Sequence, residues 1–344
     1  MKKQKFLLCL FSIFLASLIL CLPIFAKENT LDSTGEMKLY VGGMPFGAKI
    51  TSKGLTVVKF SETQGENASS AYEAGIRQGD IIYKINNTEI NTIEDFVKQI
   101  DKSRGNPLTV YVLRNNKELF FTVTPKYSSD DGKYKTGIWV KDSTSGIGTV
   151  TFIDPKTNMF GGLGHAICDG TTGKTVPLTR GIVMDVSING VIKGQSGIAG
   201  ELKGTFEAKK IGTLLKNCEC GVFGVLASNA ISSPEEPMPI CTKNEVCEGE
   251  AYIWCTLDEN GPQKYTVQIS NVDTSNSATK NFRIKITDEK LLLKSGGIVQ
   301  GMSGSPIIQN GKLVGAVTHV LINDPTQGYG IFIENMLSSM NSNS

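Results

Sequence analysis

The chain has 344 residues, of which 40% are apolar and 20% charged, so it is too long and too apolar for a disordered or fibrous protein. At about 150 residues per domain, this length favours two domains after any leader. The formal net charge is +2, and Lys2, Lys3 and Lys5 supply three of the positive charges before position 27. The rest of the chain therefore has no basic field for nucleic acid, which excludes nucleic-acid binding as its main function.

The N-terminal segment 1–26 is predicted to be an export signal or a membrane anchor. A basic head is followed by residues 6–26, which contain no charged side chain. An apolar run of about 20 residues is long enough to cross a bilayer as a helix, and a positive head keeps the N-terminus in the cytoplasm. We expect everything after residue 26 to be exported, with the polar residues 27–36 as a tether. Ile24 fits the small-residue rule for cleavage after Ala26 poorly, so cleavage and retention of the leader both stay open.

Six cysteines follow the leader, and five of them lie within residues 218–255. Outside the reducing cytoplasm such a set can form disulfides, but buried free thiols explain it equally well. The spacings match no zinc template, and no histidine lies close by to complete one. The sequence therefore implies no metal and no cofactor, and it leaves open the pairing of Cys168, Cys218, Cys220, Cys241, Cys247 and Cys255.

Residues 37–126 are predicted to form a compact module. Segment 71–90 reads as a short helix, a turn at Gly79-Asp80 and a strand that ends at Asn86-Asn87. A capping box of Thr92 and Asp95 opens an amphipathic helix, and two alternating strands then flank the turn Asn115-Asn116. This order of elements, with AGIRQGDIIYKINNTEI as its clearest segment, resembles a PDZ domain.

The resemblance implies peptide binding by addition to a sheet edge, with a glycine-rich loop that holds a terminal carboxylate through backbone N–H groups. The loop expected to do so consists of Gly42, Gly43, Met44, Phe46 and Gly47. Pro45, which has no N–H, departs from the usual pattern. The alternative is that the module only docks against the neighbouring domain.

Residues 137–344 are expected to form a mainly β domain, because short alternating strands and glycines recur along them. Helix is expected only at 208–216 and at 333–339. At this length, two small barrels are more natural than one.

Two histidines occur in the whole chain, His165 and His319. His165 follows a glycine-rich strand end, and imidazole is the usual base near neutral pH. Far downstream, Ser303 lies in the segment 301–306, GMSGSP, where converging N–H groups of Gly301 and Ser303 would form an oxyanion hole. Ser305 is a competing nucleophile. Four aspartates could orient the histidine: Asp154, Asp169, Asp288 and Asp324.

The serine motif, the upstream histidine and the all-β domain resemble chymotrypsin-like serine proteases. Met302 stands where that family has an aspartate beside the nucleophile, so activation by an N-terminal ammonium group does not apply. The resemblance implies a double β-barrel, with the floor of the substrate pocket near residues 295–297. No carboxylate lies on that floor, so strict preference for Lys or Arg is not expected.

The whole exported chain resembles one family, the stage IV sporulation protein B peptidases of endospore-forming bacteria. The segments that carry this match are GGLGHAICDG (161–170), KGQSGIAGE (193–201) and residues 287–337. The resemblance implies an exported or membrane-tethered serine endopeptidase with the triad His165, Asp288 and Ser303.

It also implies two protein partners, its own N-terminal segment and a regulator of a membrane-embedded protease. Cleavage of that regulator between the two forespore membranes would release a late sigma factor. An exported quality-control protease and a catalytically silent PDZ scaffold are the alternatives.

Overall fold

The structure, a computed structural model, describes residues 37–61, 68–130, 132–170, 172–227, 236–275 and 278–342. The predicted leader, residues 1–26, and tether, residues 27–36, lie outside this part of the chain. Within the described ranges, no helix is long and apolar enough to cross a membrane.

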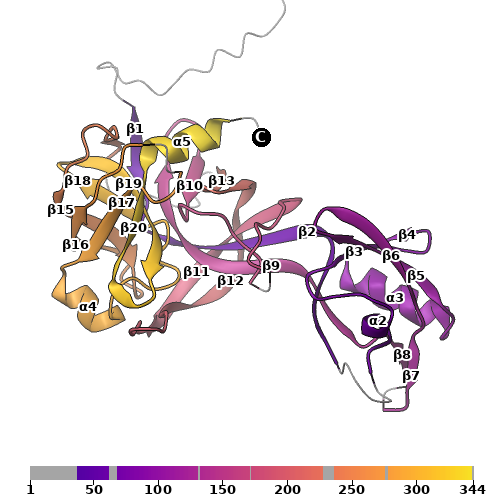
Figure 1. The fold of residues 1–344 in the computed structure, drawn as a ribbon. Helices are drawn as coiled ribbons and strands as arrows, with labels where there is room; N and C mark the ends of the chain where they lie inside the picture. Colours follow the sequence, from indigo (N-terminus) through magenta and orange to yellow (C-terminus); the bar gives the residue numbers. More distant parts are fainter. Residues whose placement is uncertain are drawn as a thin grey trace, which may run out of the picture. The chain divides into compact units, whose positions relative to one another are not determined.

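Six strands close into a first β-barrel. Hydrogen-bonded neighbours follow the order β9–β10–β13–β12–β11–β2, and pairing of β2 with β9 closes the ring (Figure 1). Phe46, Val150 and Phe160 lie in its buried core. The strands are β2 (Pro45–Phe60), β9 (Ile138–Ile153), β10 (Met159–Gly162), β11 (Arg180–Ile192), β12 (Glu201–Cys218) and β13 (Gly221–Leu226), and β1 (Lys38–Val41) joins β9 to β14 (Met238–Pro239).

A long two-stranded ribbon leads out of this barrel. Strands β2 and β9 have 16 residues each, and they pair from Pro45↔Thr149 to Phe60↔Ile138. At about 3.3 Å per residue each strand is roughly 50 Å long. The barrel half of β2 buries Phe46, whereas its distal half buries Leu55 in a second, separate core.

The second core belongs to a module inserted between the two long strands. Its sheet runs β9–β2–β3–β5–β6. Asn115 and Asn116 adopt φ of 50° and 62° in the predicted tight turn. The predicted capping box is confirmed, because Thr92 Oγ1 accepts from Asp95 N at 3.1 Å and Asp95 Oδ2 accepts from Thr92 N at 3.2 Å. The elements are α2 (Ser70–Glu73), β3 (Ile81–Ile85), β4 (Thr88–Glu89), α3 (Ile93–Ser103), β5 (Leu108–Arg114), β6 (Lys117–Val123), β7 (Lys126–Ser128) and β8 (Lys133–Lys135).

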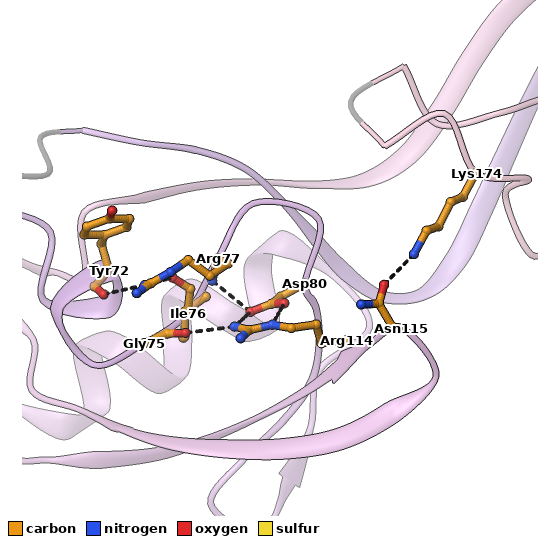
Figure 2. A network of polar contacts seen from close by, with 8 residues as sticks. All are labelled: Tyr72, Gly75, Ile76, Arg77, Asp80, Arg114, Asn115 and Lys174. Atoms are coloured by element: carbon orange, nitrogen blue, oxygen red, sulfur yellow. Dashed lines mark hydrogen bonds and ion pairs between the residues drawn. The ribbon is translucent and has the colours of Figure 1, made fainter.

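An ion pair between the buried carboxylate of Asp80 and the partly exposed Arg114 holds this module together (Figure 2). Asp80 is 0% exposed, and its carboxylate accepts from Arg114 Nε at 2.6 Å, Arg114 Nη2 at 2.7 Å and Arg77 N at 2.9 Å. Arg114 also donates to the carbonyl of Gly75 at 2.8 Å. The pair therefore ties β5 to the turn that precedes β3.

A second barrel closes in the order β15–β16–β17–β20–β19–β18. Its core includes Ile253, Val267, Ile284 and Val317. The strands are β15 (Gly249–Thr256), β16 (Pro262–Ser270), β17 (Phe282–Ile286), β18 (Pro306–Gln309), β19 (Lys312–Leu321) and β20 (Asp324–Phe332), accompanied by α4 (Glu289–Ser295) and α5 (Ile333–Asn341). The predicted mainly β architecture and the C-terminal helix are confirmed.

The predicted boundaries of the modules, 37–126 and 137–344, need correction. Residues 45–51 pair within the first barrel, and residues 138–141 pair within the inserted module, because both long strands pass through both units. Segment 208–216 was expected to be helical but lies within β12, where β11 and β13 pair with it on either side.

Candidate active site

His165, Ser303 and His319 line one cavity of about 620 Å³. His165 follows β10 in the first barrel, Ser303 lies just before β18, and His319 is on β19 of the second barrel. The two imidazole rings lie 5.0 Å apart between centroids. The structure therefore brings the predicted nucleophile and the predicted base into the same cavity.

Ser303 lies on a tight loop bounded by Gly301 and Gly304, whose φ values are 96° and 95°. Glycine adopts this left-handed conformation without strain. A Cβ at Gly304 would also lie 2.0 Å from the carbonyl oxygen of Thr149, which leaves room for glycine alone. The hydroxyl of Ser303 donates to the carbonyl of Thr318 at 2.7 Å.

Two threonines on β9 hold this loop from the first barrel. Thr149 Oγ1 donates to the carbonyl of Gly301 at 2.8 Å, and Thr149 N donates to the carbonyl of Ser303 at 3.0 Å. Thr151 Oγ1 donates to the carbonyl of Gly304 at 2.7 Å. Within the described residues, the N–H groups of Gly301 and Ser303 donate to no protein acceptor. Sequence reasoning missed both threonines, since nothing in a β-strand pattern marks a contact between barrels.

His165 follows two residues with positive φ, Leu163 at 65° and Gly164 at 66°. Its Nδ1 lies 2.9 Å from the carbonyl of Ala166, so the tautomer with a proton on Nδ1 satisfies that contact. Burial lowers the pKa of His165 below its ordinary 6.5. Desolvation and the neighbouring His165 lower the pKa of His319 to about 4. Both shifts favour the neutral ring at pH 7, the form in which Nε2 of His165 can accept a proton.

The structure does not bring Asp288 to His165. Asp288 is the N-cap of α4, where Oδ1 accepts from Leu291 N at 3.0 Å and Oδ2 from Thr266 N at 3.4 Å. Its three rivals also accept hydrogen bonds from local backbone N–H groups: Asp154 from Lys156, Asp169 from Thr172 and Asp324 from Thr326. The role of Asp288 in a triad stays a prediction.

Ser305, the competing nucleophile, is 0% exposed. Its hydroxyl donates to the carbonyl of Met302 at 2.6 Å, and the side chain does not line the cavity. A serine without access to the cavity cannot reach a peptide bond there, which favours Ser303.

The glycine-rich segment 42–47 lies in the first barrel and not in the inserted module, so its predicted role in peptide binding is wrong. Gly42 N and Gly43 N already donate to the carbonyls of Thr151 and Val150, at 2.9 and 2.8 Å. Phe46 is 0% exposed in the barrel core. These two amides cannot bind a carboxylate, because they already donate hydrogen bonds to β9 of the barrel.

A different edge of the inserted module is open. A cavity of about 830 Å³ lies between α3 and residues 136–139, lined by Phe96, Val97 and Ile100 on the helix side. Among the strands that the structure describes, only β2 pairs with residues 138–141, so these residues form an edge of this module's sheet. Within the described part of the chain, the N–H groups of Thr136 and Gly137 donate to no acceptor. Trp139, 58% exposed, lies at the same edge.

The six cysteines after the leader are free thiols in the structure. Burial raises the pKa of Cys220 and raises that of Cys241 to about 11, which keeps both thiols protonated at neutral pH. In the described ranges, no group of three histidine, cysteine or acidic side chains lies close enough to hold a metal ion.

Two barrels with the serine loop and the histidine at a shared cavity have the arrangement of a chymotrypsin-like serine peptidase, here with an inserted PDZ domain. A family model for SpoIVB peptidase S55 matches residues 132–337, and a PDZ-domain model matches residues 46–124. The chain belongs to the SpoIVB peptidase S55 family, and is a serine peptidase by that membership.

Curated relatives match short segments. The chain is 45% identical over 56 residues to the probable protease eep of Enterococcus faecalis and 34% identical over 67 residues to the regulator of sigma-W protease RasP of Bacillus subtilis. These matches span 16% and 20% of this chain. They span only 13% and 16% of those relatives, so the activities of the whole relatives do not transfer with the match.

Solved serine proteases show a distant likeness. The active form of the Rv3671c protease from M. tuberculosis aligns over 58% of this chain and 76% of its own, with 13% identity and a TM-score of 0.33. The thermostable serine protease AL20 from an extremophilic microorganism aligns over 58% and 92%, with 11% identity and a TM-score of 0.33. Likeness at this level does not equate individual residues.

Proposed function

We propose that the chain is a serine endopeptidase in which Ser303 is the acyl nucleophile and His165 its general base. The observation that carries this proposal is their placement at one cavity, with Ser303 on a glycine-bounded loop. Ser303 Oγ bonds to the scissile carbonyl carbon while Nε2 of His165 takes the hydroxyl proton. The carbon–nitrogen bond then breaks as His165 protonates the leaving amine, and water releases the acyl group by the same route.

The N–H groups of Gly301 and Ser303 serve as donors to the oxyanion in this reaction. Their carbonyl groups are held by Thr149, which supports the loop conformation that the donors need. Because the hydroxyl of Ser303 donates to Thr318 in the structure, attack requires a rotation of its side chain toward His165. Asp288 remains a predicted third member, although its described contacts are those of a helix cap.

The biological role that we propose rests on membership of this family. The enzyme processes itself and cleaves a regulator of a membrane-embedded protease, in the space between the forespore and mother-cell membranes. Release of a late sigma factor is the outcome. The SpoIVB family match supports this role.

Export through segment 6–26 is part of the same proposal. In sporulating cells, full-length chain is expected in the membrane fraction, and a shorter form cut within residues 27–70 is expected in the soluble intermembrane fraction. Fractionation followed by N-terminal sequencing checks this. Full-length chain confined to the cytosol, with no shorter form, would contradict export.

The PDZ module receives an extended peptide, such as the enzyme's own N-terminal segment, along the edge at residues 136–139. Two features support this site: the amides of Thr136 and Gly137, and the cavity beside α3. The peptide adds a strand to the open edge, and its side chains enter the cavity.

Excision of the module tests its regulatory role. Thr51 and Ser143 are paired across the ribbon, so an Asn-Gly turn can replace residues 52–142 and leave the barrel strands in register. Acylation of Ser303 by a fluorophosphonate is expected to persist, while the timing of cleavage of the partner protein changes. A full-length Trp139→Ala chain, altered only at the open edge, is the companion variant. Unchanged timing in both chains would refute regulation by this module.

A further inference from the structure

The segment that leads into the serine loop is closed against the second barrel. The resemblance to chymotrypsin-like proteases predicts the floor of the substrate pocket near residues 295–297. In the structure Ser295 and Ile298 are 0% and 2% exposed, and residues 295–299 do not line the active-site cavity. Resting on the function proposed above, we propose that Ile298 occupies the pocket for the residue before the scissile bond and restricts that residue to side chains no larger than valine.

The proposed mechanism divides the substrate between the two sides of Ser303. His165 protonates the leaving amine, so the residues after the scissile bond lie on the side of His165. Residues 144–147 and 165–168 of the first barrel line the cavity on that side. The side chain of the acyl residue therefore lies on the opposite side, toward the second barrel, where Ser303 donates to the carbonyl of Thr318 on β19.

Ile298 fills the space on that side, between the serine loop and β20. A Cβ at Gly328 of β20 would lie 2.6 Å from Cδ1 of Ile298 and 2.5 Å from the carbonyl oxygen of His319 on β19. Gly328 pairs with Val320, so this contact lies where the two strands run side by side. Ile298 belongs to the buried core of the second barrel. The room that Gly328 leaves beside the strands is therefore already taken.

The backbone around Ile298 is held from two directions. Ile298 N donates to the carbonyl of Pro325 on β20 at 2.8 Å, and a Cβ at Gly297 would lie 2.2 Å from the same oxygen. Gly194, in the turn between β11 and β12, donates through its N–H to the carbonyl of Ser295 at 2.9 Å. A bound peptide would have to break these contacts to displace Ile298, so we expect Ile298 to stay in place during catalysis.

The predicted floor also offers no partner to a charged side chain. Ser295 Oγ lies 3.0 Å from the carbonyl oxygen of Leu291 and 2.6 Å from that of Gly297, so its hydroxyl proton is used within the segment. The next side chains, Ile298 and Val299, are apolar and buried. A lysine or arginine before the scissile bond would bury its charge there without compensation, which is costly.

The test uses full-length protein and a series of peptidyl diphenyl phosphonates that differ only in the side chain next to phosphorus. Ser303 Oγ bonds to phosphorus and a phenol leaves, so the rate of inactivation reports how well that side chain fits. The alanine and valine probes are expected to react within about fivefold of each other. The phenylalanine and lysine probes are expected to react about 100-fold more slowly than alanine, as a misfit in an apolar pocket does.

Ile298→Ala is expected to raise the rate of the phenylalanine probe about tenfold or more and to leave that of the alanine probe within about threefold of the parent. Ile253→Ala is the matched control, because Ile253 is an equally buried isoleucine of the same core on β15, which pairs with β16 and β18. It is expected to lose stability and to keep the parent's preference. If Ile298→Ala does not fold, the probe series on the parent decides alone.

A parent chain that reacts with the phenylalanine or lysine probe as fast as with the alanine probe would overturn the assignment. A folded Ile298→Ala chain with the parent's preference would do the same. Failure of the proposed function looks different, because then neither the phosphonates nor a fluorophosphonate, which carries no amino-acid side chain, would modify Ser303.

Discussion

Replacement of Ser303 by alanine is expected to lower peptide-bond hydrolysis by about 10⁴-fold or more, because nucleophile and base act as a unit. The variant should fold, since the hydroxyl is only part-buried and donates a single hydrogen bond, to Thr318. Self-processing of the chain, or cleavage of its partner protein, measures the loss.

Ser305→Ala is the matched control two positions away. The buried hydroxyl of Ser305 donates to the carbonyl of Met302, so its removal is expected to cost about 1 kcal/mol of stability. Its activity should stay close to that of the parent. An inactive Ser305→Ala beside a self-processing Ser303→Ala would reverse the assignment of the nucleophile.

Replacement of Arg114 by alanine is expected to be the most damaging change in the PDZ module. Asp80 is fully buried, and Arg114 is its ion-pair partner at 2.6 Å. Removal of Arg114 leaves the buried carboxylate of Asp80 with only the N–H of Arg77 as donor, and because Arg114 is partly exposed this costs about 2 kcal/mol. Urea unfolding, together with hydrogen exchange at α2 and β5, measures the change.

Lys98→Ala, which also removes one positive charge from the same module, is the control. Lys98 is exposed on α3, and its loss is expected to change the free energy of unfolding by less than about 0.5 kcal/mol. Equal effects of the two variants would show that the Asp80–Arg114 pair does not hold the module together.

Local signals in the sequence predicted local structure well. The capping box at Thr92 and the turn at Asn115-Asn116 are confirmed because their geometry depends on neighbours within a few residues. The boundaries predicted for the two modules are wrong, and the cause is not local. A strand such as β2, which serves two cores in succession, has the same apolar pattern as two strands that serve one core each.

In the candidate site too, some residues could be predicted from the sequence and others could not. Ser303 and His165 could be found because glycines around each one mark an unusual backbone, and the structure places both at one cavity. The acid that would orient the histidine has no such glycine pattern around it in the sequence. Asp288 directly precedes a helix, and the same pattern is the signature of an N-cap, which is the role the structure gives it.

In the proposed mechanism, Ser303 is the residue that is acylated during catalysis. The most direct measurement is mass spectrometry of full-length protein treated with a fluorophosphonate, digested and sequenced to locate the adduct. We expect one modified serine, Ser303, and no modification of that position in His165→Ala, because the base that activates the hydroxyl is gone. An adduct on Ser305, or equal modification of Ser303 in the absence of His165, would contradict it.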